Sequence, residues 1–360
     1  MPLKGEGGIV ARQRITLMDV AVRAGVSRTT ASFVMTGRRD MRISNDAEQR
    51  VLQAARELDY RPNLLARSLR TNLSQTIGLI SDVVATEPFA GQLIRSSIIT
   101  ALLHDHLLFV GESEGDPEVE QHLVRSMLDR GVGGFLYASL STREVKLSAL
   151  LKSQSLVLLN CVSRTRGITA VVPDEYGAGR TAAQALLDAG HRDGIYLIGE
   201  TPDHVLAGVE RLSGITAALE EAGAALAGHL PSRWWPDSGY DAVRDLIAGG
   251  DRPTALICLN DRIAFGAYQA AAELGIAIPR DMSVISFDDS DLASWARPQL
   301  TSVAIPHLEL GRRATELLLS PDRKPGIYKV EMPLRSRGSI AAPKRVRRKR
   351  THTPDGSPTA

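Results

Sequence analysis

The sequence has little cysteine and no long apolar run. Only two of the 360 residues are cysteines, Cys161 and Cys258, and each stands inside a short apolar stretch. We therefore expect two buried, reduced strand residues rather than disulfides or metal ligands. No segment approaches the roughly 20 apolar residues that cross a bilayer, and residues 1–14 contain no stretch like the apolar part of a signal peptide. These absences predict a cytoplasmic protein with no membrane partner.

Motifs for nucleotide binding and catalysis are also missing. No GxGxxG or GxxxxGKS pattern follows an expected strand, which argues against a phosphate-binding loop. Nothing supplies a matched nucleophile, a cofactor motif or a metal-binding cluster, so we expect no enzyme activity, no cofactor and no metal ion. The chain does have 43% apolar residues, which suffice for a sizeable core. Its length allows one small and one large domain.

Charge is unevenly distributed along the chain. Residues 1–76 hold 13 Lys and Arg against 7 Asp and Glu, residues 341–360 hold 6 against 1, and the segment between holds 24 against 33. Both ends are therefore basic around an acidic body. A basic N-terminal segment is typical of a DNA-binding module, because phosphate contacts supply most of the non-specific affinity. The acidic body would stay off the duplex, although solubility alone also explains its charge.

Residues 16–37, TLMDVAVRAGVSRTTASFVMTG, carry a helix-turn-helix pattern. Apolar residues recur at helical spacing on both sides of Gly25, where a sharp turn tolerates no bulky side chain. Thr16 and Ser27 precede the two helical patterns and are the expected N-caps. The second helix fits a DNA major groove with its polar and basic outer residues, which are Arg28, Thr29 and Ser32. An ordinary surface helical hairpin has the same spacing.

A third helix is expected from Ser44 to about Asp59, with an apolar stripe that closes a three-helix core. Pro62 then disfavours helix for the residue before it, and Asn63 can cap a new helix over LLARSLRTNLSQ. That segment is short and has little apolar face, so it should become ordered only against a partner.

From Thr76 onward, short β-branched runs alternate with helical stretches such as those around 93–103 and 119–128. The runs are TIGLISDV, LLFVGES, GGFLYAS, SLVLLNCV, ITAVV, GIYLIGE, TALICLN and MSVISF. Such alternation predicts parallel sheets covered by helices on both faces. About ten strands are more than one domain of this kind usually holds. We therefore expect an α/β body of two doubly wound lobes, with ligand at the carboxyl ends of the strands.

Polar residues follow several of these strands directly. They are Asp82 after TIGLIS, Asn160 at the end of LVLLN, the pair Asn260-Asp261 at the end of ALICLN, and the pair Asp288-Asp289 after VISF. Carboxylates and amides at strand ends can exchange hydrogen bonds with sugar hydroxyls, and an aromatic face can cover the apolar side of a sugar ring. Each residue could instead cap the helix that follows. For Asp261 and Asp289 both interpretations stay open.

The chain resembles transcription regulators of the LacI/GalR (lactose repressor) family. Residues 16–37 match the family's helix-turn-helix, YRPNLLARSL at 60–69 matches its hinge helix, and LNDRIAFGAYQAAAELGIAIPRDMSVISFDDSDLASWARPQLTSV matches its most recognisable C-terminal stretch. The resemblance implies base reading by Arg28, Thr29 and Ser32, and phosphate contacts by Thr16 and Ser27. It also implies that two hinge helices pair in the minor groove, with Asn63 and Ala66 along the groove and Leu69 as a wedge that opens a base step.

For the body, the resemblance implies a periplasmic-binding-protein-type fold with crossover segments near residues 161, 290 and 320. It also implies an effector site for a sugar between the lobes. The implied effector residues are Asp82, Phe89, Asn160, Arg211, Trp234, Asn260, Asp288 and His307. Trp235 competes with Trp234 for the aromatic position. Ala138 stands where several members have a polar ligand contact, a departure that fits a larger ligand.

These features together predict a sequence-specific DNA-binding repressor that acts as a homodimer on a palindromic operator under the control of a small-molecule effector. It would work in the cytoplasm, on the nucleoid. The expected fold is α/β, with an all-α N-terminal headpiece joined to a two-lobed body. The expected domains are a disordered arm (1–14), a helix-turn-helix domain (15–61), a hinge helix and linker (62–75), an effector-binding and dimerisation domain (76–340) and a basic disordered tail (341–360).

Two other classes of protein share parts of this pattern. A solute (sugar)-binding protein of a transport system would have the same body fold, but it needs export and has no use for a basic N-terminal domain. An enzyme could use the same cleft, with Asp288 and Asp289 as acid and base.

Overall fold

The computed structural model of the chain describes residues 15–37, 43–60, 74–85 and 91–344. These residues form two compact units, which divide between Gln75 and Thr76. Asn63, Ala66, Leu69 and Phe89 lie outside the described residues, as do the expected arm and most of the expected tail. Within the described ranges, no helix is long and apolar enough to cross a membrane. The domain boundaries given above stay predictions.

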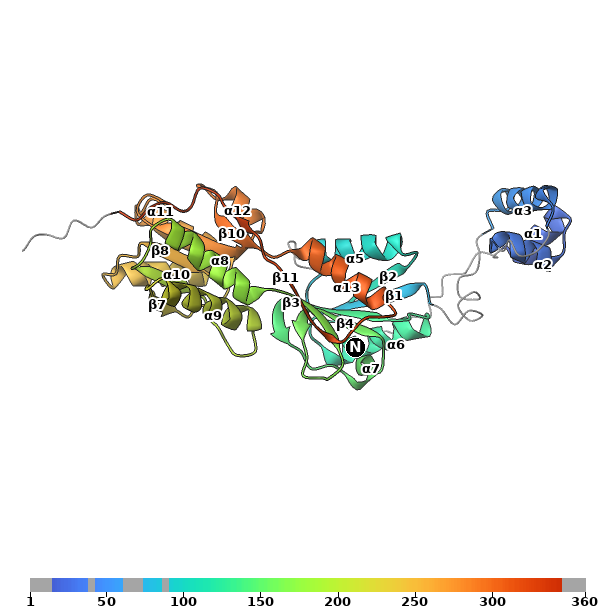
Figure 1. Cartoon of the computed structure of the whole chain (residues 1–360), viewed down its shortest axis with the longest axis horizontal. Helices are drawn as coiled ribbons and strands as arrows, with labels where there is room; N and C mark the ends of the chain where they lie inside the picture. Colours follow the sequence, from blue (N-terminus) through green and yellow to red (C-terminus); the bar gives the residue numbers. More distant parts are fainter. Residues whose placement is uncertain (1–14, 38–42, 61–73, 86–90, 345–360) are drawn as a thin grey trace, which may run out of the picture. The chain divides into compact units, whose positions relative to one another are not determined.

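The first unit is a bundle of three short helices around one core (Figure 1). The expected turn lies at Gly25, whose φ of 65° is the left-handed conformation that glycine adopts without steric cost. Buried alanines and valines from all three helices make the core, and the predicted stripe of the third helix contributes Val51 and Ala55. The helices are α1 (Leu17–Ala24), α2 (Arg28–Met35) and α3 (Asn45–Glu57).

Each of these helices begins at the cap that the sequence predicts. The amide of Thr30 donates to Ser27 Oγ at 3.0 Å, and Ser44 caps α3 in the same way. Thr16 forms a reciprocal capping box, because its Oγ1 accepts from the Asp19 amide at 3.3 Å while its own amide donates to Asp19 Oδ2 at 2.8 Å. These caps determine where α1 and α2 begin, and hence which side chains of α2 face outward.

The second unit consists of two α/β lobes, each built on a six-stranded sheet (Figure 1). The sheet of the first lobe has the order β11-β5-β4-β3-β1-β2, and all its strand pairs are parallel. Figure 1 shows α13 and β11, orange to red, completing this lobe from the far end of the chain. The elements of the first lobe are β1 (Thr76–Ser81), α5 (Gly91–Leu103), β2 (Leu107–Glu112), α6 (Pro117–Asp129), β3 (Phe135–Glu144), α7 (Ala149–Lys152), β4 (Leu156–Val162), β5 (Thr169–Pro173), α13 (His307–Leu319) and β11 (Gly326–Val330).

Helices cover both faces of the first sheet. Leu136 and Leu159 belong to the apolar cluster under α5 and α13, whereas Phe135 and Leu158 belong to the cluster under α6 and α7. Because successive side chains of a strand alternate between faces, the two clusters lie on opposite sides of the sheet. The doubly wound arrangement predicted from the sequence is thereby confirmed for this lobe.

The second lobe repeats this plan with the order β12-β10-β9-β8-β6-β7, in which only the β10–β12 pair is antiparallel. Both cysteines are fully buried, free strand residues as predicted, Cys161 in β4 and Cys258 in β8. The elements of the second lobe are α8 (Glu175–Asp188), β6 (Ile195–Ile198), α9 (Leu206–Glu221), β7 (Leu226–Leu230), α10 (Pro236–Ala248), β8 (Ala255–Cys258), α11 (Asp261–Glu273), β9 (Ser283–Asp288), α12 (Asp291–Trp295), β10 (Thr301–Ala304) and β12 (Leu334–Arg335).

The chain passes between the lobes after β5, after β10 and after β11. The crossovers expected near residues 161, 290 and 320 are therefore wrong, because each of those positions is followed by a further element of the same lobe. Those elements are β5, α12 and β11. An apolar run reveals a strand but not the sheet it joins, since both sheets bury their two faces.

Four strands had no counterpart among the expected runs, namely β7, β10, β11 and β12. They have between two and five residues. Three of them lie at sheet edges. Short edge strands carry little of the apolar pattern by which buried strands are recognised.

In each sheet the strand order reverses beside the first strand of the lobe. β2 and β3 flank β1 in the first lobe, and β7 and β8 flank β6 in the second. At such a reversal a crevice opens at the carboxyl ends of the strands, and open α/β sheets bind their ligands there. The strand-end residues of both lobes are thus placed where a ligand would bind.

Candidate functional site

The first unit exposes polar side chains at the start of α2. Arg28 and Thr29 are exposed and Ser32 is half-buried, while the opposite side of the helix enters the core. The capping residues Thr16 and Ser27 are exposed at the N-termini of α1 and α2. Helix N-termini present free amides and partial positive charge, which suit phosphate groups. The DNA-contacting roles of these five residues stay predictions.

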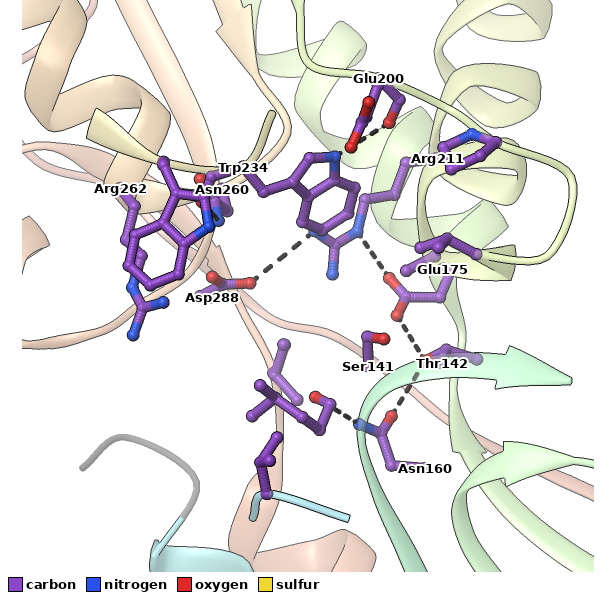
Figure 2. A pocket seen from close by; sticks show the side chains of 17 residues that line it. Ser141, Thr142, Asn160, Glu175, Glu200, Arg211, Trp234, Asn260, Arg262 and Asp288 are labelled. Carbon is purple, nitrogen blue, oxygen red and sulfur yellow. Dashed lines mark hydrogen bonds and ion pairs between the residues drawn. The ribbon is translucent and has the colours of Figure 1, made fainter. Parts of the chain in front are cut away.

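A cavity of about 400 Å³ lies between the lobes of the second unit (Figure 2). Thr142 and Asn160 contribute to its wall from the first lobe, and Arg211, Asn260 and Asp288 contribute from the second. The volume falls in the range of small-molecule sites, and the mixture of apolar wall and few polar groups is typical of them. The cavity is therefore the candidate effector site.

Arg211, on α9, is the central charged group of the cavity. Its side chain is only 1% exposed, and its Nε donates to Glu175 Oε2 at 2.7 Å. Nη1 donates to the carbonyl of Leu259 at 2.6 Å and lies 3.7 Å from Asp288 Oδ1. Its guanidinium carbon also lies 5.6 Å from the centre of the Trp234 ring. Two carboxylates, a carbonyl and an aromatic ring thus hold one cation in a single orientation.

A chain of hydrogen bonds continues from Arg211 to the first lobe (Figure 2). Glu175, the first residue of α8, accepts from Arg211 through Oε2 and from Thr142 Oγ1 through Oε1, the latter at 2.8 Å. The Thr142 hydroxyl also lies 2.9 Å from Asn160 Oδ1, and Asn160 Nδ2 donates to the Ser139 carbonyl at 2.9 Å. Since Thr142 and Asn160 belong to one lobe and Glu175 and Arg211 to the other, these contacts join the lobes across the cavity.

Asp288, the last residue of β9, has a φ of 101° and a side chain that is 12% exposed. Burial, the largest cause, raises the pKa of its carboxyl to about 7; Arg211 opposes the rise, and the charge of Asp261 adds to it. Near neutral pH the group therefore exists in both forms, so it can donate or accept a hydrogen bond. A strained backbone is common where a side chain must be aimed at a ligand.

Asn260 and Trp234 form a wall beside the arginine. Asn260 caps α11, because its Oδ1 accepts from the Ile263 amide at 2.8 Å, and its Nδ2 lies 3.3 Å from the Trp234 carbonyl. The Trp234 Nε1 donates to the carbonyl of Glu200 at 2.9 Å, which fixes the indole against Arg211 (Figure 2). For Asn260 the helix-cap interpretation is correct, and the residue lines the cavity as well.

The structure brings together five of the eight predicted effector residues, which are Asn160, Arg211, Trp234, Asn260 and Asp288. The Asp82 carboxylate is used inside the first lobe, by Ser139 Oγ at 2.7 Å and Arg143 Nη2 at 2.9 Å. His307, the first residue of α13, lines a second cavity of about 340 Å³, and burial lowers the pKa of its imidazole to about 4. Phe89 lies outside the described residues. The effector-binding roles of all eight stay predictions.

The carboxylates of Asp261 and Asp289 are engaged by other side chains of the second lobe. Asp261 accepts from three serine hydroxyls at 2.5 to 2.8 Å, and Asp289 forms an ion pair with Arg337 at 2.6 Å. Neither lines the cavity between the lobes, which Asp288 alone of the three reaches. Asp288 and Asp289 line a common wall in the second cavity, beside His307, whereas the cavity of about 400 Å³ does not present them together as an acid–base pair.

Thr142, Glu175, Glu200 and Arg262 also line the cavity, although the sequence analysis did not single them out. Glu175 and Glu200 follow closely after β5 and β6, so the strand-end argument that selected Asn160 would have found them. Thr142 and Arg262 lie inside a strand and a helix, where no sequence signal marks them. Among the described residues, no group of His, Cys, Asp and Glu could hold a metal ion.

Comparison with known proteins identifies the same two parts. The profile of the bacterial regulatory proteins, lacI family, matches residues 16–63, and that of the periplasmic binding protein-like domain matches residues 183–340. The ribose operon repressor of Haemophilus influenzae is 32% identical over 313 residues, which cover 86% of this chain and 92% of that protein.

Two solved structures have the same fold. The Lac repressor dimer bound to operator and the anti-inducer ONPF matches with a TM-score of 0.77 at 24% identity, covering 92% of this chain and 100% of that one. The complex of the transcriptional regulator CelR with cellobiose matches with a TM-score of 0.63 at 27% identity, covering 91% and 100%.

These matches decide between the classes considered above. A lacI-family module at residues 16–63 is a DNA-binding module, and the ribose operon repressor, which matches over 86% of the chain, is a repressor. The solute-binding protein of a transport system is therefore the wrong alternative, and the protein is a transcription regulator rather than an enzyme. The chain belongs to the LacI family of bacterial regulatory proteins.

Proposed function

We propose that this regulator represses transcription by binding a palindromic operator as a homodimer. A carbohydrate bound in the cavity between the lobes controls its affinity for the operator. The proposal is carried by one observation, the presence in one chain of a helix-turn-helix unit and of a cavity whose polar groups come from two lobes. A ligand that contacts both lobes favours the lobe arrangement it binds best. In a dimer this preference reaches the DNA through the hinge segments.

For the DNA side, we propose that Arg28, Thr29 and Ser32 read bases and that Thr16 and Ser27 position the unit on phosphates. Their exposure at the N-terminal ends of α1 and α2 supports this assignment. Asn63, Ala66 and Leu69 complete it as minor-groove residues of the hinge. A protein with this function acts on the nucleoid.

For the effector side, a neutral polyol fits the cavity better than an anion. The charge of Arg211 is already met by Glu175 at 2.7 Å, so its remaining N–H groups can serve hydroxyls but offer no unbalanced charge. Asn160 and Asn260 line the same cavity. Each amide oxygen has one partner, Thr142 and Ile263 respectively, and keeps a second lone pair that can accept from a hydroxyl. The names of two relatives support a carbohydrate, since one represses a ribose operon and another was solved with cellobiose.

A gel-shift titration tests the DNA side. At moderate salt, the purified protein should bind a palindromic operator far more tightly than a scrambled duplex of equal length. Equal affinity for both would refute sequence-specific binding. A thermal-shift screen of mono- and oligosaccharides tests the effector side, because a ligand at 100 times its dissociation constant stabilises by about 2.7 kcal/mol.

Two variants separate the proposed roles. Leu69→Ala should weaken specific operator binding and leave effector binding intact. Arg211→Lys keeps a cation beside Glu175 but loses the planar fork, so it should abolish the effector response and retain operator affinity. Loss of both functions in either variant would contradict this division.

A further inference from the structure

The protein holds the two neighbouring tryptophans of the cavity in different ways. Trp234 is half-buried and its Nε1 donates to the Glu200 carbonyl, whereas Trp235 lines the same cavity with 51% of its surface exposed. In the part of the chain that the structure describes, no protein atom accepts from the Trp235 Nε1. Trp235 has an extended backbone, with φ −126° and ψ 155°, and successive side chains of an extended chain point to opposite sides. The two indoles therefore line different parts of the cavity wall.

Arg262 holds the outer tryptophan in place. Its guanidinium carbon lies 4.6 Å from the centre of the Trp235 ring, within the range of a cation–π contact. Figure 2 shows Arg262 across Asp288 from Arg211. About half of the surface of Trp235 stays exposed beside this cation, so the indole can contact a further group. An aromatic face held in this way is a platform for the CH face of a sugar ring.

The cavity is also larger than one sugar ring requires. It measures about 400 Å³, whereas a single hexose at the density of close-packed organic matter takes up roughly 200 Å³. Buried polar groups gather around Trp234, where Arg211 and Asn260 are 1% and 6% exposed. The end at Trp235 opens toward solvent. One ring at the inner end thus leaves room for a second beside Trp235.

We propose that the cavity has two subsites and that its effector is a disaccharide or a longer oligosaccharide. The inner ring binds beside Trp234, within reach of Arg211 and Asp288, and the second ring stacks on the exposed part of the Trp235 indole. This inference rests on the proposed function, since it assumes a carbohydrate effector. It makes Trp235 a residue that selects for ligand length, whereas the inner groups bind any ligand that has the first ring.

Isothermal titration of the full-length protein with cellobiose, maltose, lactose and sucrose, and with glucose, galactose and fructose, tests the proposal. At least one disaccharide should bind roughly tenfold more tightly than either of its own monosaccharides, the scale of one added aromatic contact. Trp235→Ala should reduce that affinity to the level of the monosaccharide and leave monosaccharide binding unchanged. Trp235→Phe should retain most of the advantage because it keeps an aromatic face.

Trp295→Ala is the matched control, since Trp295 is 68% exposed and lies outside the cavity wall. It should change neither affinity. A monosaccharide that binds as tightly as every disaccharide containing it would overturn the two-subsite inference and leave the proposed function standing. So would an unchanged disaccharide affinity in Trp235→Ala. If no sugar of either size bound, the inference and the carbohydrate effector would both be refuted.

Discussion

At the scale of residues, a single buried arginine organises the cavity between the lobes. Arg211, Glu175 and Asp288 form a group of one cation and two carboxylates, with side chains that are 1%, 3% and 12% exposed. One guanidinium cannot balance two ionised carboxylates removed from water. The protein resolves this excess at Asp288, the more exposed acid, whose pKa burial raises to about 7. The Arg211–Glu175 contact at 2.7 Å is also shorter than the Arg211–Asp288 contact at 3.7 Å.

Removing Arg211 should be costly for folding. Arg211→Ala would leave Glu175 buried without its cation, and breaking a buried pair in this way typically lowers the free energy of unfolding by about 3–5 kcal/mol. Arg180→Ala is the control, because Arg180 pairs with Glu221 on the same two helices, with both side chains exposed. Urea unfolding should show a large loss for the first variant and little change for the second.

The double variant Glu175→Gln, Arg211→Met should lose less stability than Arg211→Ala, because no uncompensated charge stays buried. Equal stability losses in Arg211→Ala and Arg180→Ala would show that the burial of the pair has no energetic consequence.

The raised pKa of Asp288 predicts a pH-dependent stability. Its folded value of about 7 exceeds the unfolded value of about 3.9, so the folded state binds the extra proton between these values. The stabilising contribution is therefore complete below pH 4 and is lost as the pH rises through 7. Compared with Asp288→Asn, the wild-type free energy of unfolding should fall from pH 5 to pH 8, by at most about 1.4 kcal/mol per pH unit. Parallel pH profiles for the two proteins would contradict the shift.

At the scale of elements, the residue at which a helix begins determines which side chains reach the two proposed sites. In the first unit, the caps at Thr16 and Ser27 set the first residues of α1 and α2. They thereby decide that Arg28 and Thr29 lie outermost in the first turn of α2. In the second unit, Glu175 is the first residue of α8, directly after a crossover. The start of that helix therefore carries both the ion pair with Arg211 and the hydrogen bond from Thr142 that joins the lobes. Short sequence features at helix ends therefore have consequences for both proposed sites.

Removing the first cap should loosen α1 without altering the proposed DNA-reading face. Thr16→Ala deletes the oxygen that accepts from the Asp19 amide. The loss of such a cap lowers the stability of the helix by about 1 kcal/mol. Hydrogen exchange of the full-length protein should show roughly fivefold less protection in α1.

Thr29→Ala is the reciprocal control, because Thr29 is exposed in α2 and is not one of the capping residues. It should leave the protection of α1 unchanged and weaken the preference for operator over scrambled DNA. Equal protection in both variants and the wild type would show that the cap contributes nothing.

At the scale of the whole molecule, we expect the proposed homodimer to form through the first lobe. One side of α5 and the adjoining edge strand β2 expose large apolar side chains, which we call the dimer face. It consists of Ile98, Ile99, Leu102, Leu103, Leu107 and Val110. Contiguous exposed apolar residues of this kind mark interaction surfaces. A pair of chains joined there would bring two helix-turn-helix units to one palindrome.

A charge in the dimer face should separate the two chains. Leu103 is 78% exposed, so Leu103→Glu should hardly change the stability of a single chain, but it would bury a carboxylate in a dimer. Sedimentation should show monomers. Operator affinity should fall by roughly a hundredfold, because binding to the second half-site is then no longer intramolecular.

Ile327→Glu provides the comparison, since Ile327 is 61% exposed on β11, at the opposite edge of the same sheet. That variant should remain dimeric with wild-type operator affinity. If Leu103→Glu behaved in the same way, the dimer would have to form through another surface.

The sequence by itself determined the features that depend on near neighbours. The caps at Thr16 and Ser27, the turn at Gly25 and the buried strands of both lobes each follow from a few consecutive residues, and each appears where it was predicted. The family resemblance added Arg211 and Trp234, which no local pattern singles out, and both line the cavity.

Only the tertiary structure decided which sheet each strand joins and which polar side chains line the cavity. The sequence selected both Asp82 and Asn160 as strand-end residues. Asn160 lines the cavity while bound to Thr142 and Ser139, whereas Asp82 is bound by Ser139 and Arg143 inside the first lobe. Glu175 meets Arg211 only because two helices that start 31 residues apart lie side by side. Such partners are distant in sequence, so local propensity and spacing carry no information about them, and only the packing of the whole lobe brings them together.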